Sequence, residues 1–141
     1  MTPNAAFRIS PPSASAPEWE ILQTRRPNVL LTAPREVVDA ALARLWPLLE
    51  APVYEWSSRA GIFGPGRSIT VLIRDVETLT CEQQHTVLAW LDSTKPQEIQ
   101  IVSTAHVEVF PLVERGVFLS RLYYRLNVLQ LDACTLIREA V

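Results

Sequence analysis

The sequence comprises 141 residues, of which 48% are hydrophobic, and it carries a formal net charge of -2. A chain of this size and composition forms one domain with a hydrophobic core and is too short for two. The weakly acidic balance lacks the basic footprint that phosphate-backbone binding requires, so direct nucleic-acid binding is disfavoured. No apolar run approaches the roughly 20 residues of a membrane span, and the N-terminus lacks the layout of a secretory signal. We therefore expect a cytoplasmic protein without a membrane association.

The first part of the chain has the composition of a tail. Residues 2–17 contain four prolines among serines and alanines, and such a segment buries too little apolar surface to offset its chain entropy. We expect residues 1–26 to form a disordered or loosely attached tail and residues 27–141 to form the α/β domain.

The first half of this domain predicts alternating strands and helices. The apolar run 28–32 lies between two prolines and is typical of a buried parallel strand. Apolar residues at helical spacing predict an amphipathic helix over 35–46. Residues 53–56 are a candidate short edge strand, the glycines of 61–66 mark a loop, and the β-branched run 69–73 predicts a central strand.

The second half continues the alternation. Thr80 is a suitable N-cap for a helix over 81–91, and the run 99–104 predicts another strand. Residues 110–126 are expected to be mostly helical with an interruption at a glycine, followed by a strand over 128–131. Because parallel strands need helical crossovers, this order predicts an α/β fold with a parallel sheet and helices on both of its faces.

Three stretches resemble one protein family. Residues 118–128 (FLSRLYYRLNV) resemble the F-R-x-D-L-Y-Y-R-L-N-V signature of the AAA+ domain in sigma-54-dependent transcription activators, the bacterial enhancer-binding proteins. Residues 101–118 and 70–91 fit further stretches of that domain without a gap. The resemblance implies a Rossmann-like P-loop (AAA+) three-layer sandwich, here expected to lack the helical lid of the family.

The resemblance fails at the residues that bind nucleotide. Arg74-Asp75 stands where the family has the Walker B pair Asp-Glu, so a cation replaces the carboxylate that holds Mg²⁺. Only Ala33-Pro34 remains of the glycine-rich phosphate loop, and Arg35 occupies the lysine position. Ala105, followed by His106, stands at the sensor position. The domain therefore resembles a truncated, degenerate AAA+ core without ATPase activity.

A degenerate nucleotide site remains one interpretation of these positions. Its candidate residues are Arg35, Arg74, Asp75 and His106. The other interpretation treats Arg35 as a solvated surface arginine and His106 as an ordinary structural histidine, because it lacks a second ligand at metal spacing. We expect no catalytic residue, no metal and no cofactor.

The family signature also suggests interface residues. In the family, arginines of this region reach the nucleotide of the neighbouring subunit, and Arg125 corresponds to one of them. Arg125 fits two roles, a structural arginine paired with a local carboxylate or an interface residue that contacts a partner. Tyr123, Tyr124 and Arg121 are further candidates for an interface, although aromatic residues at helical spacing are often core residues.

The leading functional hypothesis is a non-catalytic transcription-regulation module that acts by protein–protein contact. The partner implied by the resemblance is an AAA+ activator, the sigma-54 machinery or a second copy of the chain. Two alternatives remain: a weak nucleotide-binding protein or residual ATPase, and a structural remnant without a retained partner.

Overall fold

The structure is a computed structural model that describes residues 25–95 and 98–132. Five parallel strands form one sheet in the order β2-β3-β4-β1-β5. The strands are β1 (Val29–Thr32), β2 (Val53–Ser57), β3 (Thr70–Arg74), β4 (Gln100–Ala105) and β5 (Leu129–Asp132). The expected α/β fold with a parallel sheet is thus confirmed, and the candidate edge strand is β2.

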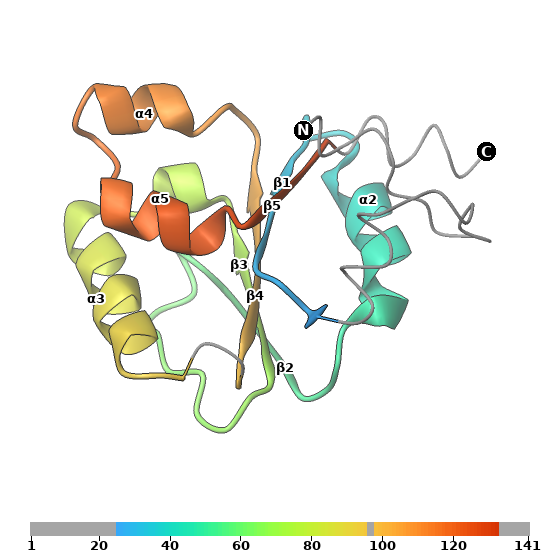
Figure 1. Cartoon of the computed structure of the whole chain (residues 1–141). Coiled ribbons are helices and arrows are strands. Elements are labelled where there is room, and N and C mark those ends of the chain that lie inside the picture. Colours follow the sequence, from blue (N-terminus) through green and yellow to red (C-terminus); the bar gives the residue numbers. More distant parts are fainter. Residues whose placement is uncertain (1–24, 96–97, 133–141) are drawn as a thin grey trace.

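Helices cover both faces of the sheet (Figure 1). On one face lies α2 (Val38–Leu45), which a short 3-10 turn, η2 (Trp46–Leu48), extends. The other face carries α3 (Cys81–Asp92), α4 (Phe110–Glu114) and α5 (Ser120–Leu126). This arrangement gives the three layers that the sequence resemblance implies.

The core divides into two clusters because side chains of a strand alternate between the faces of a sheet. Leu31 and Leu72 face α2 and pack with Leu42 of that helix. On the opposite face, Leu30 and Ile73 join buried side chains of α3 and α5, and partly buried side chains of α4 pack against this cluster. Strands β1, β3 and β4 are buried along nearly their whole length, as expected for the centre of a parallel sheet covered on both faces.

Two helices differ from the sequence-based expectation at their ends. The helix expected from residue 35 begins at Val38, because residues 34–37 form a turn in which the Val37 amide bonds to the Pro34 carbonyl. The stretch expected to be mostly helical forms α4 and α5, and Gly116 interrupts it at a positive φ of 77. Glycine is the residue that adopts such a φ without strain.

The start of α3 follows the prediction. The Thr80 side chain accepts a hydrogen bond from the Gln83 amide, and the Gln83 side chain accepts one from the Thr80 amide. This reciprocal capping box satisfies two amides that the first turn of a helix would otherwise leave without partners. The predicted buried stripe of Val87, Leu88 and Leu91 lies in the core.

The expected tail over residues 1–26 lies almost wholly outside the described residues. Its last residue, Arg26, contacts the domain through an ion pair with Glu50 at 3.2 Å and a hydrogen bond to Thr70. Among the helices within the described ranges, none is long and apolar enough to cross a membrane.

Candidate functional site

The candidate site lies at the carboxyl ends of the three central strands. β1 ends at Thr32, β3 at Arg74 and β4 at Ala105, and these strands are neighbours in the order β3-β4-β1. The helix after β1 covers one face of the sheet, whereas the helices after β4 cover the other. In open α/β sheets, such a switch in the direction of the crossovers leaves a crevice at the strand ends where ligands bind.

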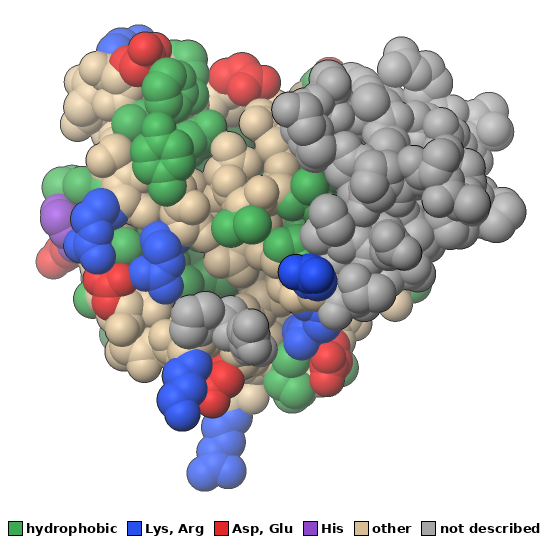
Figure 2. All heavy atoms as spheres, in the orientation of Figure 1, with side chains coloured by type: hydrophobic (Ala, Val, Ile, Leu, Met, Phe, Trp, Pro, Cys, Tyr) green, Lys and Arg blue, Asp and Glu red, His purple; other side chains and the backbone are tan. Residues whose placement is uncertain are grey.

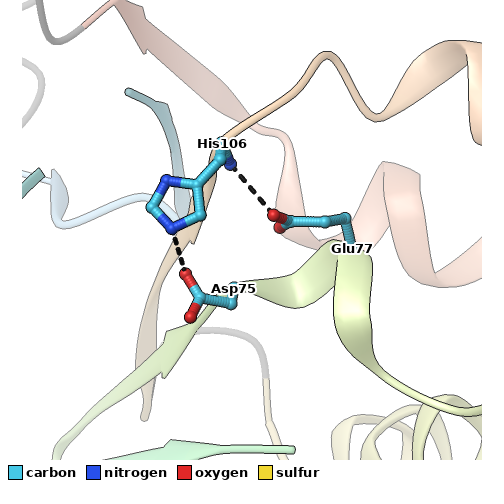
Figure 3. A group of neighbouring side chains, drawn as sticks. All are labelled: Asp75, Glu77 and His106. Carbon is cyan, nitrogen blue, oxygen red and sulfur yellow. Dashed lines mark hydrogen bonds and ion pairs between the residues drawn. The ribbon is translucent and has the colours of Figure 1, made fainter. Parts of the chain in front are cut away.

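Three polar side chains converge at this edge (Figure 3). Asp75 follows β3, Glu77 lies in the 3-10 turn η3 (Val76–Thr78), and His106 follows β4. One potential ligand atom from each of the three lies within 4.8 Å of the others. The Nε2 atom of His106 lies 2.8 Å from Oδ1 of Asp75, and the His106 amide donates to Oε2 of Glu77 at 3.2 Å. The site therefore combines two carboxylates with one imidazole.

The chain holds Asp75 in an unusual backbone conformation. Its φ of 57 and ψ of 54 lie in the left-handed region, which residues other than glycine rarely adopt. Its amide donates to the Thr104 hydroxyl of β4, and its carbonyl accepts from the Thr78 amide and hydroxyl. These bonds turn the chain sharply after β3 and bring the Asp75 carboxylate, which is 33% exposed, next to His106.

Arg74 points to the opposite face of the sheet from this cluster. Its guanidinium donates to Oδ1 of Asp39 in the first turn of α2 at 2.7 Å and forms an ion pair with Glu55 of β2 at 3.6 Å. Partial burial lowers the pKa of Arg74, but the hydrogen bond and charge of Asp39, followed by those of Glu55, more than offset this effect and raise the pKa. Arg74 therefore stays charged and engaged by carboxylates.

The segment between β1 and α2 has few amides left to hold phosphate groups. The Ala33 amide donates to the Ala105 carbonyl at 2.8 Å and so extends the β1–β4 ladder. Pro34 has no amide hydrogen. Arg35 is exposed, and within residues 25–95 and 98–132 it forms no hydrogen bond or ion pair. A phosphate cradle needs several amides directed at one point, so these residues do not fit a Mg²⁺-nucleotide in the manner of a P-loop.

Of the four residues assigned to a degenerate nucleotide site, the structure brings Asp75 and His106 together. Arg74 adjoins them in sequence but binds carboxylates on the other face, and Arg35 lies in the exposed turn after β1. The expectation that His106 has no companion at ligand spacing is wrong, because Asp75 and Glu77 are far from it in sequence but near it in space. Sequence reasoning missed Glu77, although Glu77 lies shortly after the predicted strand 69–73 and His106 shortly after the predicted strand 99–104.

The candidate interface residues lie on α5, at a different part of the surface. Arg121 and Arg125 both bind the Asp92 carboxylate at the end of α3, at 3.0 and 2.6 Å. Desolvation raises the pKa of Asp92, but the hydrogen bonds from the two arginines outweigh it and lower the pKa below its usual value. Arg125 also donates to the Leu91 carbonyl, so its guanidinium links α5 to α3.

The two tyrosines of the signature have different environments. Tyr123 is buried in the core and accepts a hydrogen bond from Asn127, whereas Tyr124 is 62% exposed. Tyr124 and Arg125 line a groove of about 500 Å³ together with Arg25, Arg26 and Lys95. Of the candidate aromatic interface residues, Tyr124 is thus the one available to a partner.

No family model and no curated protein matches this sequence. The structure is similar to solved structures of NtrX from Brucella abortus. The complex of NtrX with ATP aligns with a TM-score of 0.63 and 16% identity, and the complex with ADP aligns with a TM-score of 0.62 and 16% identity. A third NtrX structure aligns with a TM-score of 0.61 and 15% identity. Each alignment covers 81% of this chain, which spans only 33% to 35% of the NtrX chains.

At this level of identity the likeness concerns the fold alone. The chain has the AAA+-like α/β fold that its sequence resemblance predicts.

Proposed function

We propose that this chain is a transcription-regulation module with an AAA+-like fold that acts by contact with another protein and does not hydrolyse ATP. The observation that carries this proposal is the position of Arg74. Where the resemblance places the carboxylate that binds Mg²⁺, a guanidinium is held by Asp39 at 2.7 Å and by Glu55 at 3.6 Å.

At the position of the Mg²⁺ ligand, the chain has lost a carboxylate and also gained a positive charge. The two ion pairs of Arg74 hold that charge in place. A dication placed beside the guanidinium would be repelled by it, and the Asp39 and Glu55 carboxylates that could screen this repulsion already serve Arg74. The amide of Ala33 is likewise bonded within the sheet. The Mg²⁺ position next to the nucleotide and the phosphate groups thus each lack a partner that phosphoryl transfer requires.

Exposed hydrophobic side chains support a role in contact. Among the described residues, five of the seven large hydrophobic side chains that are exposed lie between residues 107 and 128, in and around α4 and α5. They are Val107, Phe110, Val117, Tyr124 and Val128. Figure 2 shows hydrophobic side chains gathered over α4. Concentrated apolar exposure of this kind marks surfaces that bind other proteins.

The first experiment measures the thermal unfolding midpoint with and without millimolar Mg-ATP or Mg-ADP. A ligand that binds only the folded state stabilises it by RT ln(1 + [L]/Kd), so a Kd near 10 μM would raise stability by about 2.7 kcal/mol at 1 mM nucleotide. We expect no shift. A shift that disappears in Arg74→Ala would show that a rebuilt site binds nucleotide, and it would overturn the proposal.

The second experiment tests contact directly. The chain is titrated into an intact AAA+ activator of the sigma-54 type, and the ATPase rate of the activator is measured, while sedimentation equilibrium tests self-association of the chain. We expect at least one of these signals, and we expect Tyr124→Ala to weaken it. Ile62→Ala, at an exposed hydrophobic residue remote from α5, is the matched control. If neither signal is found, the contact proposal fails.

A further inference from the structure

We propose that Asp75, Glu77 and His106 form a binding site for a divalent transition-metal ion, held by protein atoms alone and without a nucleotide. The ligands are one imidazole nitrogen and two carboxylate oxygens, all within 4.8 Å of one another. They follow the carboxyl ends of β3 and β4, and rigid neighbouring strands therefore set their spacing.

The hydrogen bonding of His106 directs one ring nitrogen into the cluster. Its Nδ1 atom lies 3.0 Å from the Ala33 carbonyl oxygen. A carbonyl only accepts, so Nδ1 carries the hydrogen, and Nε2 is the ring nitrogen that lies next to Asp75 and that a metal would use. A backbone carbonyl that fixes the tautomer and orientation of the ring is the usual outer partner of a metal-binding histidine. The His106 side chain is 10% exposed, so little bulk water is available to Nε2.

Each of the two carboxylates has a buried oxygen that could bind a cation. Within the described part of the chain, Oδ1 of Asp75 and Oε1 of Glu77 are buried and form no hydrogen bond. Oδ1 lies 2.8 Å from Nε2 of His106, the ring nitrogen that would share the metal with it. Oε2 of Glu77 accepts from the His106 amide, which holds the carboxylate in place and leaves Oε1 for another partner. Buried carboxylate oxygens without partners are costly, and a cation removes that cost.

The separation of 2.8 Å between Nε2 and Oδ1 is short enough for one metal ion to contact both atoms. A metal about 2.1 Å from both Nε2 and Oδ1 would subtend an angle of roughly 84° between them, near the right angle of octahedral coordination. Tetrahedral coordination at the same bond lengths would separate the two atoms by about 3.4 Å.

Charge favours a dication at this point. The two carboxylates and the neutral imidazole carry a total charge that a divalent ion balances, and Arg74 is directed away toward Asp39 and Glu55. A ligand set with one nitrogen and two oxygens suits Mn²⁺, Fe²⁺, Co²⁺ and Ni²⁺, with water in the remaining positions. This site differs from a Mg²⁺-nucleotide site, because none of its ligands comes from a phosphate.

Isothermal titration calorimetry of the untagged chain with Co²⁺, Mn²⁺ and Zn²⁺, without nucleotide, tests the proposal. We expect one equivalent to bind, with Co²⁺ giving the weak visible absorption of octahedral coordination. His106→Gln should abolish binding, and Asp75→Asn and Glu77→Gln should each weaken it at least tenfold. His85→Gln, at an exposed histidine of α3, should bind as the unaltered chain does.

Three outcomes would overturn the proposal: no binding to the unaltered chain, equal binding by His106→Gln, or loss of binding in His85→Gln. Circular dichroism confirms that each variant is folded. Because a glutamine at position 77 can still accept the hydrogen bond from the His106 amide, Glu77→Gln keeps the test decisive if Asp75→Asn does not fold. The nucleotide and activator experiments above are independent of this one, so either proposal can fail without the other.

Discussion

The Gln84 side chain forms three hydrogen bonds, two of which link α3 to the segment between α4 and α5. Its side chain is buried, and its Nε2 donates to the carbonyls of Leu79 and Val117, both at 3.1 Å. Its Oε1 accepts from the Leu119 amide at 2.8 Å. All three partners are backbone groups that have few alternatives in this interior, so Gln84 determines how the α5 segment is attached.

Replacement of Gln84 by methionine keeps the length and approximate volume of the side chain but removes all three bonds. At about 1 kcal/mol for each lost bond, we expect the free energy of unfolding to fall by about 3 kcal/mol. For a domain of this size, that loss lowers the thermal unfolding midpoint by roughly 10 °C. Amide hydrogen exchange should also accelerate selectively at Leu119, because its amide loses the Gln84 oxygen that accepts its hydrogen bond.

Urea unfolding followed by circular dichroism measures the free energy, and His85→Met at the neighbouring exposed position is the control. A change in Gln84→Met of less than about 0.5 kcal/mol would refute the reasoning, since it would mean that water or a local shift replaces the three bonds at no cost.

Three further variants test the helices. Thr80→Ala removes the capping box of α3 and should lower stability by about 1 kcal/mol in urea unfolding; an unchanged midpoint would mean that water caps the helix equally well. Leu122→Ala, at a fully buried position of α5, should cost about 2–5 kcal/mol in the same assay, and a smaller loss would indicate that α5 packs loosely. Asp92→Asn removes the carboxylate that binds Arg121 and Arg125. Because the pKa of Asp92 is lowered in the folded state, its stabilising effect is complete above its ordinary value of 3.8 and is lost as pH falls below that value. The difference in unfolding midpoint between the unaltered chain and Asp92→Asn should therefore shrink from pH 6 to pH 3, and a constant difference would contradict the assignment.

Much of the fold could be predicted because its signals are local. A β-branched run such as 69–73 favours a strand by its own composition, and the stripe of Val87, Leu88 and Leu91 indicates a helix by its spacing alone. Thr80 was predicted to cap α3 for the same reason, since a cap involves residues only three positions apart. The ends of helices were predicted less well. The helix α2 begins at Val38 and not at residue 35, because residues 34–37 form the turn that leads the chain from β1 onto the face of the sheet.

The candidate site was only partly predictable because its residues meet through the sheet. Asp75 and His106 were singled out by their place in a family pattern, but their contact at 2.8 Å and the role of Glu77 were not. The ion pairs of Arg74 with Asp39 and Glu55 were likewise invisible in sequence.

The sequence by itself determined the order and type of the elements, because periodicity, caps and turn residues act over a few positions. The tertiary structure alone decided that β1 lies between β4 and β5, and therefore that the ends of β1, β3 and β4 share one edge. It also decided which way each side chain faces there: Arg74 and Asp75 are adjacent in sequence, yet one binds carboxylates toward α2 and the other meets His106. Parallel crossovers bring distant strand ends together, and sequence separation carries no information about which ends become neighbours.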